Sequence, residues 1–199
     1  MLLYHQPRSR SGRVLWALEE AGATYDVRVI ERSFKQDPEY RKLHPLGRAP
    51  VIVDDEGPIF ESAAILFQIA DLHPASALLA PVGTHARALQ YQWSFFAGLE
   101  VEAPLMEIAR QLWNEGSDPI AAVIDAAKGR LDAAVEVLAQ HLDGHPFLVG
   151  DAFSVADLLI AGVLGFSRIA EIAPLDERLV GYVDAIEARP ARQRALAVS

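Results

Sequence analysis

The sequence predicts an α/β domain followed by an all-helical domain, and three observations carry this prediction. Short apolar strands alternate with helical patterns over residues 1–74, which indicates a sheet layer covered by helices. Residues 75–83 contain Pro81 and Gly83 and show no periodicity, which is typical of a linker. Over residues 84–199 the patterns are helical, and the sequence suggests no strand there.

The first elements follow from local patterns. Residues 1–5 predict a strand, and residues 11–21 predict a helix that ends at Gly22. Residues 25–29 alternate apolar and polar side chains, as a second strand does. Asp37 followed by proline then predicts the start of a short helix that runs to residue 43, because an acidic N-cap before proline favours a helix start.

The stretch of residues 46–65 is the most informative part of the chain. Two apolar strands at 51–53 and 59–60 flank a turn, and Pro50 opens the first strand, where a missing N–H does least harm. Glu61 and Ser62 then stand at the start of a helix that ends near residue 72. A carboxylate and a hydroxyl are therefore expected beside unpaired helix N–H groups, which bind anions.

The helical region predicts four main segments. Residues 84–112 form one long segment with a bend at Pro104, since proline removes a helix hydrogen bond. Residues 117–119 cap a second segment that runs to residue 142. Ser154 and Asp157 form a capping box ahead of an apolar helix over 155–173, which should be buried, and a further helix covers 176–189.

Composition excludes several kinds of function. The chain has 199 residues, is 51% hydrophobic and carries a net charge of −9, which argues against nucleic acid or an anionic membrane as a partner. No apolar run approaches the length of a membrane span, and residues 1–10 lack the apolar centre of a secretory signal, so we expect a cytoplasmic protein. There is no cysteine, so the protein has no thiol nucleophile of its own, and we expect no metal site.

The chain resembles the glutathione transferases in the placement of Pro50, Glu61, Ser62 and the capping box. The resemblance covers nearly the whole chain. It implies a thioredoxin-like N-terminal domain followed by a helical-bundle domain, with glutathione as co-substrate. It also implies a cis bond between Ala49 and Pro50, and pairing of the Ala49 backbone with the cysteinyl unit of glutathione. Glu61 and Ser62 would hold the γ-glutamyl end, and Lys35 and Arg48 lie in loops where relatives contact the glycyl carboxylate.

The resemblance also suggests which hydroxyl activates the thiol. The resemblance is to bacterial, serine-type members of the family. In the serine-type classes, the catalytic serine stands four residues before an arginine that begins the apolar helix face. Counting back from Arg13 in this sequence gives Ser9. Ser11 is the competing candidate and is also well placed as a helix N-cap. Tyr4, in the first strand, is the third choice.

The function implied is a glutathione transferase that joins the thiolate of glutathione to small apolar electrophiles. We expect a homodimer, since Leu89, Trp93 and Phe96 would otherwise form an exposed apolar patch. One alternative is a non-catalytic protein of this fold that binds glutathione or apolar ligands, or serves as an interaction module. Another is a specialised glutathione-dependent dehalogenase, isomerase or peroxidase, which would differ only in its substrate pocket.

Overall fold

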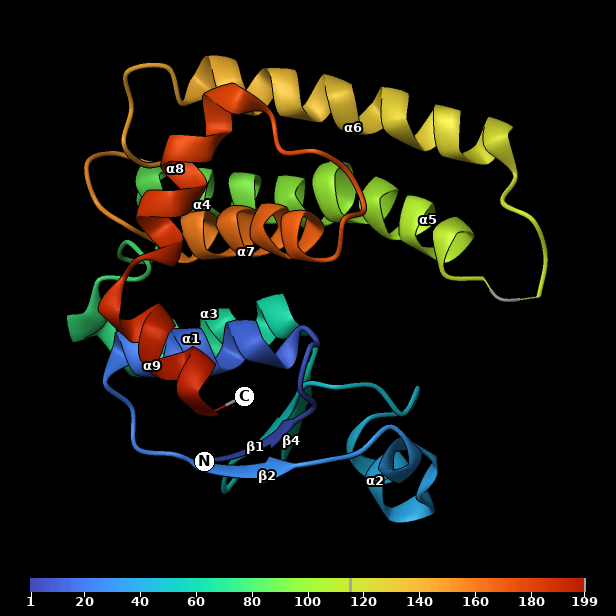
Figure 1. Ribbon diagram of the computed structural model, residues 1–199. Coiled ribbons are helices and arrows are strands. Elements are labelled where there is room, and N and C mark those ends of the chain that lie inside the picture. Colours follow the sequence, from blue (N-terminus) through green and yellow to red (C-terminus); the bar gives the residue numbers. More distant parts are fainter. Residues whose placement is uncertain (115, 199) are drawn as a thin grey trace. The chain divides into compact units, whose positions relative to one another are not determined.

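The computed structural model describes residues 1–114 and 116–198, and these form two compact units (Figure 1). Unit 1 contains Met1–Leu79 together with the residues from Ala188 onward. Unit 2 contains Ala80–Glu187. Unit 1 holds a sheet with helices and unit 2 is helical, so the predicted fold class is confirmed.

Unit 1 follows the predicted order of strands and helices. Its elements are β1 (Leu2–His5), α1 (Ser11–Ala21), β2 (Asp26–Val29), η1 (Ser33–Gln36), α2 (Pro38–Leu43), β3 (Val51–Val53), β4 (Pro58–Phe60), α3 (Ser62–Leu72), η2 (Pro74–Ser76) and α9 (Pro190–Val198). The four strands lie in the order β2-β1-β3-β4. The pair β1–β2 is parallel, whereas β3 runs antiparallel to both β1 and β4.

Apolar side chains cover both faces of this sheet. Alternation along β1 places Leu3 and His5 on one face and Tyr4 on the other. Tyr4 packs against Tyr40 of α2, with ring centroids 5.4 Å apart. Figure 1 shows α1, α3 and α9 together on one side of the sheet. The central strands β1 and β3 therefore lie in the core, as the alternation of strands and helices predicted, whereas much of β2 and β4 is exposed.

The C-terminal helix α9 has nine residues. It packs on α1 within unit 1. Arg189, just before α9, donates hydrogen bonds of 2.6 and 2.9 Å to the carboxylate of Glu20. Arg194 donates to Glu19 at 2.7 Å. These pairs join two segments that lie far apart in the sequence.

Unit 2 consists of helices packed around α7. Its elements are α4 (His85–Phe96), the π-helical stretch η3 (Ala97–Glu102), α5 (Ala103–Leu112), α6 (Ala121–His141), α7 (Val155–Ile169) and α8 (Glu177–Glu187). The helix α7 is buried along most of its length, as predicted. Among the described residues, none of the helices has the length and the apolar character that a bilayer span requires.

Three expectations for unit 2 need correction. The predicted cap at residues 117–119 is wrong, because Ile120 is the N-cap of α6 and no side chain caps it. The segment before Pro104 contains the six-residue π-helical stretch η3, so the long helix changes its winding before the proline. Trp93 is only 6% exposed, so it is not part of a surface patch; the large exposed apolar residues nearby are Phe95 and Leu99.

Candidate functional site

The predicted site residues lie in the same region of unit 1, at the end of the sheet where β1, β2 and β4 finish and β3 begins; we call this end the edge of the sheet. Tyr4, Val51 and Phe60 lie opposite one another across β1, β3 and β4. The chain therefore leaves β1 towards Ser9, enters β3 from Pro50 and leaves β4 towards Glu61, all at this edge. His5 pairs with Val29, so β2 also ends here and leads into η1 and Lys35. Strand register thus explains how residues far apart in sequence flank one edge.

The bond between Ala49 and Pro50 is cis, as the resemblance implied. Ala49 lies outside the ladder between β3 and its neighbours, which begins at Val51. The approach to Ala49 is fixed by a turn in which the N–H of Gly47 donates to the carbonyl of His44 at 2.7 Å. The hydroxyl of Tyr40 also donates to the carbonyl of Arg48 at 2.8 Å. The backbone of Ala49 is therefore held at the edge of the sheet, where a peptide could pair with it.

The N-terminus of α3 is open to a ligand. Its N-cap is Glu61, which makes no side-chain capping hydrogen bond. The first bond within the helix runs from the N–H of Ile65 to the carbonyl of Glu61 at 3.0 Å, so the N–H groups of the three preceding residues have no helical acceptor. Ser62 is 8% exposed at the start of this helix. Helix N–H groups with a serine hydroxyl beside them suit a carboxylate.

Glu61 has a backbone conformation that is rare for a side chain with a Cβ. Its φ is 71° and its ψ is 114°. A non-glycine residue in such a region costs about 1–3 kcal/mol, and such residues concentrate at functional sites. The carboxylate of Glu61 is exposed, so solvent and ligands can reach it. We interpret the conformation as strain that keeps this carboxylate at the edge of the sheet.

Lys35 and Arg48 form a positively charged group near the same edge. A Cβ on Gly47 would lie 2.4 Å from the carbonyl oxygen of Lys35, so the glycine lets the two loops meet. Burial lowers the pKa of Lys35, and the charges of Arg32 and Arg48 lower it further. Among the described residues, neither Lys35 nor Arg48 forms an ion pair with an acid. This group is therefore suited to attract a carboxylate.

His44 is a buried residue near both Arg48 and Glu61. It is 2% exposed, its ring lies 4.7 Å from that of Phe60, and its Nδ1 accepts a hydrogen bond from the N–H of Leu46. Burial lowers the pKa of His44, whereas the charge of Glu61 acts to raise it. The ring contact between His44 and Phe60, the residue before Glu61, places the loop before Pro50 close to Glu61.

Ser9 and Ser11 lie side by side in the loop after β1 and at the start of α1. Their hydroxyl oxygens are 2.8 Å apart. The Ser9 hydroxyl donates to the carbonyl of Gln6 at 2.7 Å, and its oxygen accepts from the N–H of Ser11 at 3.2 Å. Ser9 is half-buried, whereas Ser11 is fully buried. Of the two serines, Ser9 is the one that a ligand can reach.

The prediction that Ser11 caps α1 is wrong. The N-cap is Arg10, without a side-chain capping bond, and Ser11 is the first residue of the helix. The hydroxyl of Ser11 turns back to the end of β1, where it accepts from the N–H of Gln6 at 3.0 Å and lies 2.8 Å from Nδ1 of His5. A serine that caps a helix stands one position before the first helical residue, which here is the position of Arg10. The hydroxyl of Ser11 takes part in this buried network instead.

His5 and Gln6 also belong to this network, although the sequence did not predict them as site residues. His5 is completely buried, and burial lowers the pKa of its imidazole. The signal was present in the alternation of β1, because His5 follows the buried Leu3 by two residues. Tyr4, the third choice for a hydroxyl donor, has its ring in the aromatic cluster with Phe34 and Tyr40.

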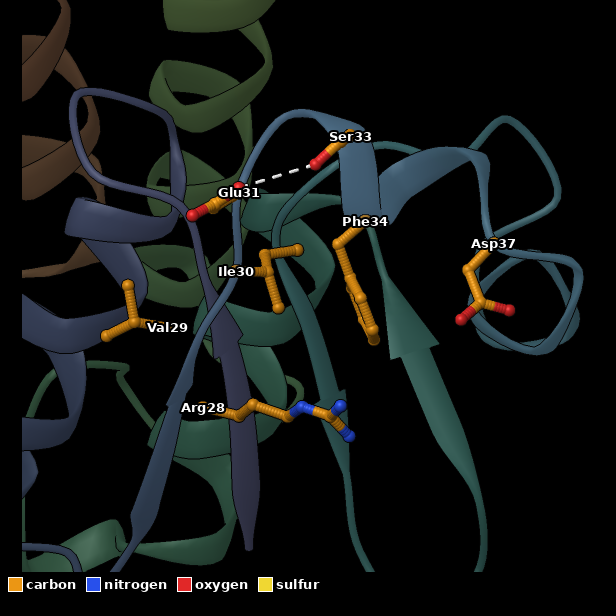
Figure 2. Close-up of a pocket in the computed structure, with 7 residues that line it drawn as sticks. All are labelled: Arg28, Val29, Ile30, Glu31, Ser33, Phe34 and Asp37. Carbon is orange, nitrogen blue, oxygen red and sulfur yellow. Dashed lines mark hydrogen bonds between the residues drawn. The ribbon is translucent and has the colours of Figure 1, made fainter.

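The pocket in Figure 2 is a different feature of unit 1. It has a volume of about 560 Å³ and is formed where β2 leads into η1. None of the eight predicted site residues lines it. Its lining consists of Arg28, Val29, Ile30, Glu31, Ser33, Phe34 and Asp37. The guanidinium of Arg28 lies 4.6 Å from the centroid of the Phe34 ring, so this arginine is engaged by an aromatic face.

Comparison with known proteins identifies the family. Residues 1–71 match the model for the glutathione S-transferase N-terminal domain, and residues 101–190 match that for the C-terminal domain. Glutathione S-transferase 1 of Dianthus caryophyllus is 31% identical over 176 residues, which cover 82% of this chain and 77% of that protein. The chain belongs to the glutathione S-transferase family.

Two further similarities widen this finding. The structure of a sphingomonad glutathione S-transferase complexed with glutathione has a TM-score of 0.84 and 26% identity, and covers 100% of this chain and 98% of that one. The probable elongation factor 1-gamma 2 of Arabidopsis thaliana is 30% identical over 84% of this transferase-family chain. The chain spans only 42% of that longer protein, and less than half of several other curated relatives.

Proposed function

We propose that this protein is a glutathione transferase that joins the thiolate of glutathione to small apolar electrophiles. The observation that carries the proposal is the convergence at one sheet edge of a reachable hydroxyl, an open helix N-terminus and two cations. These groups match the thiol and the two charged ends of glutathione. We further propose that it acts in the cytoplasm as a homodimer, with a role in detoxification.

The charged ends of glutathione suit opposite parts of this edge. The γ-glutamyl end has a carboxylate and an ammonium group: the carboxylate suits Ser62 and the N–H groups of α3, and the ammonium suits Glu61. The glycyl carboxylate suits Lys35 and Arg48. Between these ends, the cysteinyl unit would pair with the backbone of Ala49 as an added strand.

The thiol is the reacting group, and Ser9 is our candidate for its hydrogen-bond donor. A free thiol of this kind has a pKa of about 8.5, and the thiolate is the nucleophile. A hydroxyl that donates to sulfur stabilises S⁻ much more than S–H, and so lowers the pKa of the bound thiol. The N-terminal end of α1 adds a favourable dipole for the anion.

A second candidate function is supported by the relative from Arabidopsis thaliana, whose printed name is that of an elongation factor. A non-catalytic protein of this family could use the same edge to bind glutathione, or serve as an interaction module. A specialised glutathione-dependent dehalogenase, isomerase or peroxidase would share the edge and differ in the second substrate.

The two candidates separate in a pair of measurements on the whole chain. Calorimetric titration with glutathione should show binding, and a generic aryl halide should be conjugated in its presence. Binding without conjugation of any of a panel of electrophiles would favour the non-catalytic function. Failure to bind glutathione would overturn the transferase and every glutathione-binding alternative, and would leave only the interaction module. Sedimentation at micromolar concentration tests the dimer, and a stable monomer would contradict it.

A further inference from the structure

His5 is a buried titratable residue that the proposed function does not use. It lies at the end of β1 with an exposed fraction of 0%. Its Nδ1 is 2.8 Å from the hydroxyl oxygen of Ser11, and its Nε2 is buried without a hydrogen-bond partner among the described residues. Ser11 in turn lies 2.8 Å from Ser9, so a chain of hydrogen bonds connects the imidazole to the proposed thiol donor.

The direction in which protons are donated along these hydrogen bonds depends on which ring nitrogen of His5 carries the proton. Burial lowers the pKa of His5, so its imidazole is neutral and has a single N–H. A proton on Nε2 would leave a buried N–H without an acceptor, and buried N–H groups are left unpaired in proteins more rarely than acceptors are. A proton on Nδ1 finds an acceptor in Ser11 and leaves only a lone pair unpaired at Nε2. The second tautomer is therefore favoured.

With the proton of His5 on Nδ1, the hydroxyl oxygen of Ser11 accepts as many hydrogen bonds as it can. A hydroxyl oxygen accepts two hydrogen bonds and donates one. The oxygen of Ser11 accepts from the N–H of Gln6 at 3.0 Å and from Nδ1–H of His5, so it cannot also accept from Ser9. Its own proton goes either to Ser9 or to the carbonyl of Gln6, which lie at 2.8 and 2.9 Å.

The consequence reaches Ser9, because the proton of Ser9 then has only one partner within the network. That partner is the carbonyl of Gln6, at 2.7 Å, and the proton turns from this carbonyl to the sulfur when Ser9 donates to a bound thiolate. The oxygen of Ser9 already accepts from the N–H of Ser11, and it accepts a second bond when the Ser11 hydroxyl donates to it. When both of these bonds are formed, the Ser9 oxygen cannot accept another, so Ser9 can only donate its proton to a ligand. A donor of this kind stabilises S⁻ more than S–H.

We propose that His5 is a positioning residue that directs the Ser11–Ser9 hydrogen-bond chain outwards, so that Ser9 meets the bound thiol as a donor. The proposal rests on the proposed function in so far as the ligand thiol belongs to glutathione. It assigns no direct contact between His5 and the ligand. It also gives a reason for a histidine at a buried position of a strand where an apolar residue would pack.

The first test compares two variants of His5. His5→Leu removes the donor, whereas His5→Asn keeps a side-chain N–H near the position of Nδ1. The pKa of bound glutathione, measured from thiolate absorbance, should rise by about one unit in His5→Leu, which is about a ten-fold loss of thiolate well below that pKa. The glutathione KM should change by less than about two-fold, since uniform binding is retained. His5→Asn should restore most of the shift.

Equal thiol pKa values in the wild type and His5→Leu would overturn the proposal, and so would equal shifts in both variants, which would indicate a packing role. A failure of the proposed function looks different, because Ser9→Ala would then also leave the thiol pKa unchanged.

The second test needs neither a variant nor glutathione. Nitrogen-15 spectra of the imidazole rings distinguish a protonated ring nitrogen from one with a lone pair. His5, one of six histidines, should show a protonated Nδ1 and an unprotonated Nε2. The reverse pattern would overturn the proposal even if every variant failed to fold, and whatever the protein catalyses.

Discussion

The N-terminus of α7 and the N-terminus of α3 use their polar groups in opposite ways. At α7, Ser154 and Asp157 form a complete capping box, and both residues are buried. Asp157 also accepts from the N–H of Leu148 at 2.8 Å and from the hydroxyl of Tyr182 at 3.0 Å. At α3, the N-cap Glu61 is exposed, makes no capping bond and has a φ of 71°.

The difference separates a helix end whose polar groups are satisfied within the fold from one that we propose binds a ligand. Every donor around Asp157 has a protein acceptor, so a ligand would have nothing to gain there. The end of α3 leaves N–H groups and a carboxylate available, at a cost in backbone strain. Both ends have an acid and a serine in sequence, so residue type alone does not distinguish the two roles. The pattern of satisfied and unsatisfied partners does.

The largest expected effect is at the N-terminus of α7, the closed end, where the protein satisfies the polar groups. Asp157→Ala leaves three residues, Leu148, Ser154 and Tyr182, with buried donors that have lost their acceptor. The free energy of unfolding should fall by about 3 kcal/mol or more, measured by urea denaturation. Ser154→Ala, which removes only the capping hydroxyl, should cost about 1 kcal/mol. Equal losses in the two variants would mean that the comparison overstates the role of Asp157.

The next largest effect is at the N-terminus of α3, the open end, where N–H groups and a carboxylate are available. Ser62→Ala and Glu61→Ala each remove a hydrogen-bonding group for a charged ligand end, which is worth about 1.5–3 kcal/mol. The glutathione KM should rise about ten-fold or more, while the pKa of the bound thiol stays close to that of the wild type. Glu56→Ala, an exposed acid in the turn before β4, serves as the control. A KM unchanged in both site variants would show that α3 does not hold the ligand.

A smaller effect tests the strain at Glu61. Glycine adopts a positive φ without a Cβ penalty, so Glu61→Gly should raise the free energy of unfolding by about 1 kcal/mol while weakening glutathione binding. Ala63→Gly, in the first turn of α3, should instead lower the free energy of unfolding by about 0.5–1 kcal/mol. A less stable Glu61→Gly protein would show that the conformation is not strained.

The sequence predicted the succession of strands and helices along unit 1, the helix starts at Pro38 and Ser62, and the capping box at Ser154, because these features depend on local periodicity and on side chains a few residues apart. It placed a cap at residues 117–119 and another at Ser11, where tertiary contacts decide instead. The buried network of His5, Ser11 and Gln6 could not be predicted from spacing, since it depends on how the loop folds back on β1. Alternation along β1 showed only that His5 is buried.

In the proposed function, activation of the thiol depends most on the hydroxyl of Ser9. If it donates to the bound thiolate, Ser9→Ala should raise the pKa of bound glutathione towards its free value by about one unit or more, since one unit is 1.36 kcal/mol. Conjugation measured below that pKa should fall about ten-fold while the glutathione KM barely changes, and part of the rate should return at high pH. If Ser9→Ala leaves the pH–rate profile in place and Ser11→Ala shifts it, Ser11 is the donor and the account of Ser9 is wrong. If neither variant shifts the profile, no serine hydroxyl activates the thiol.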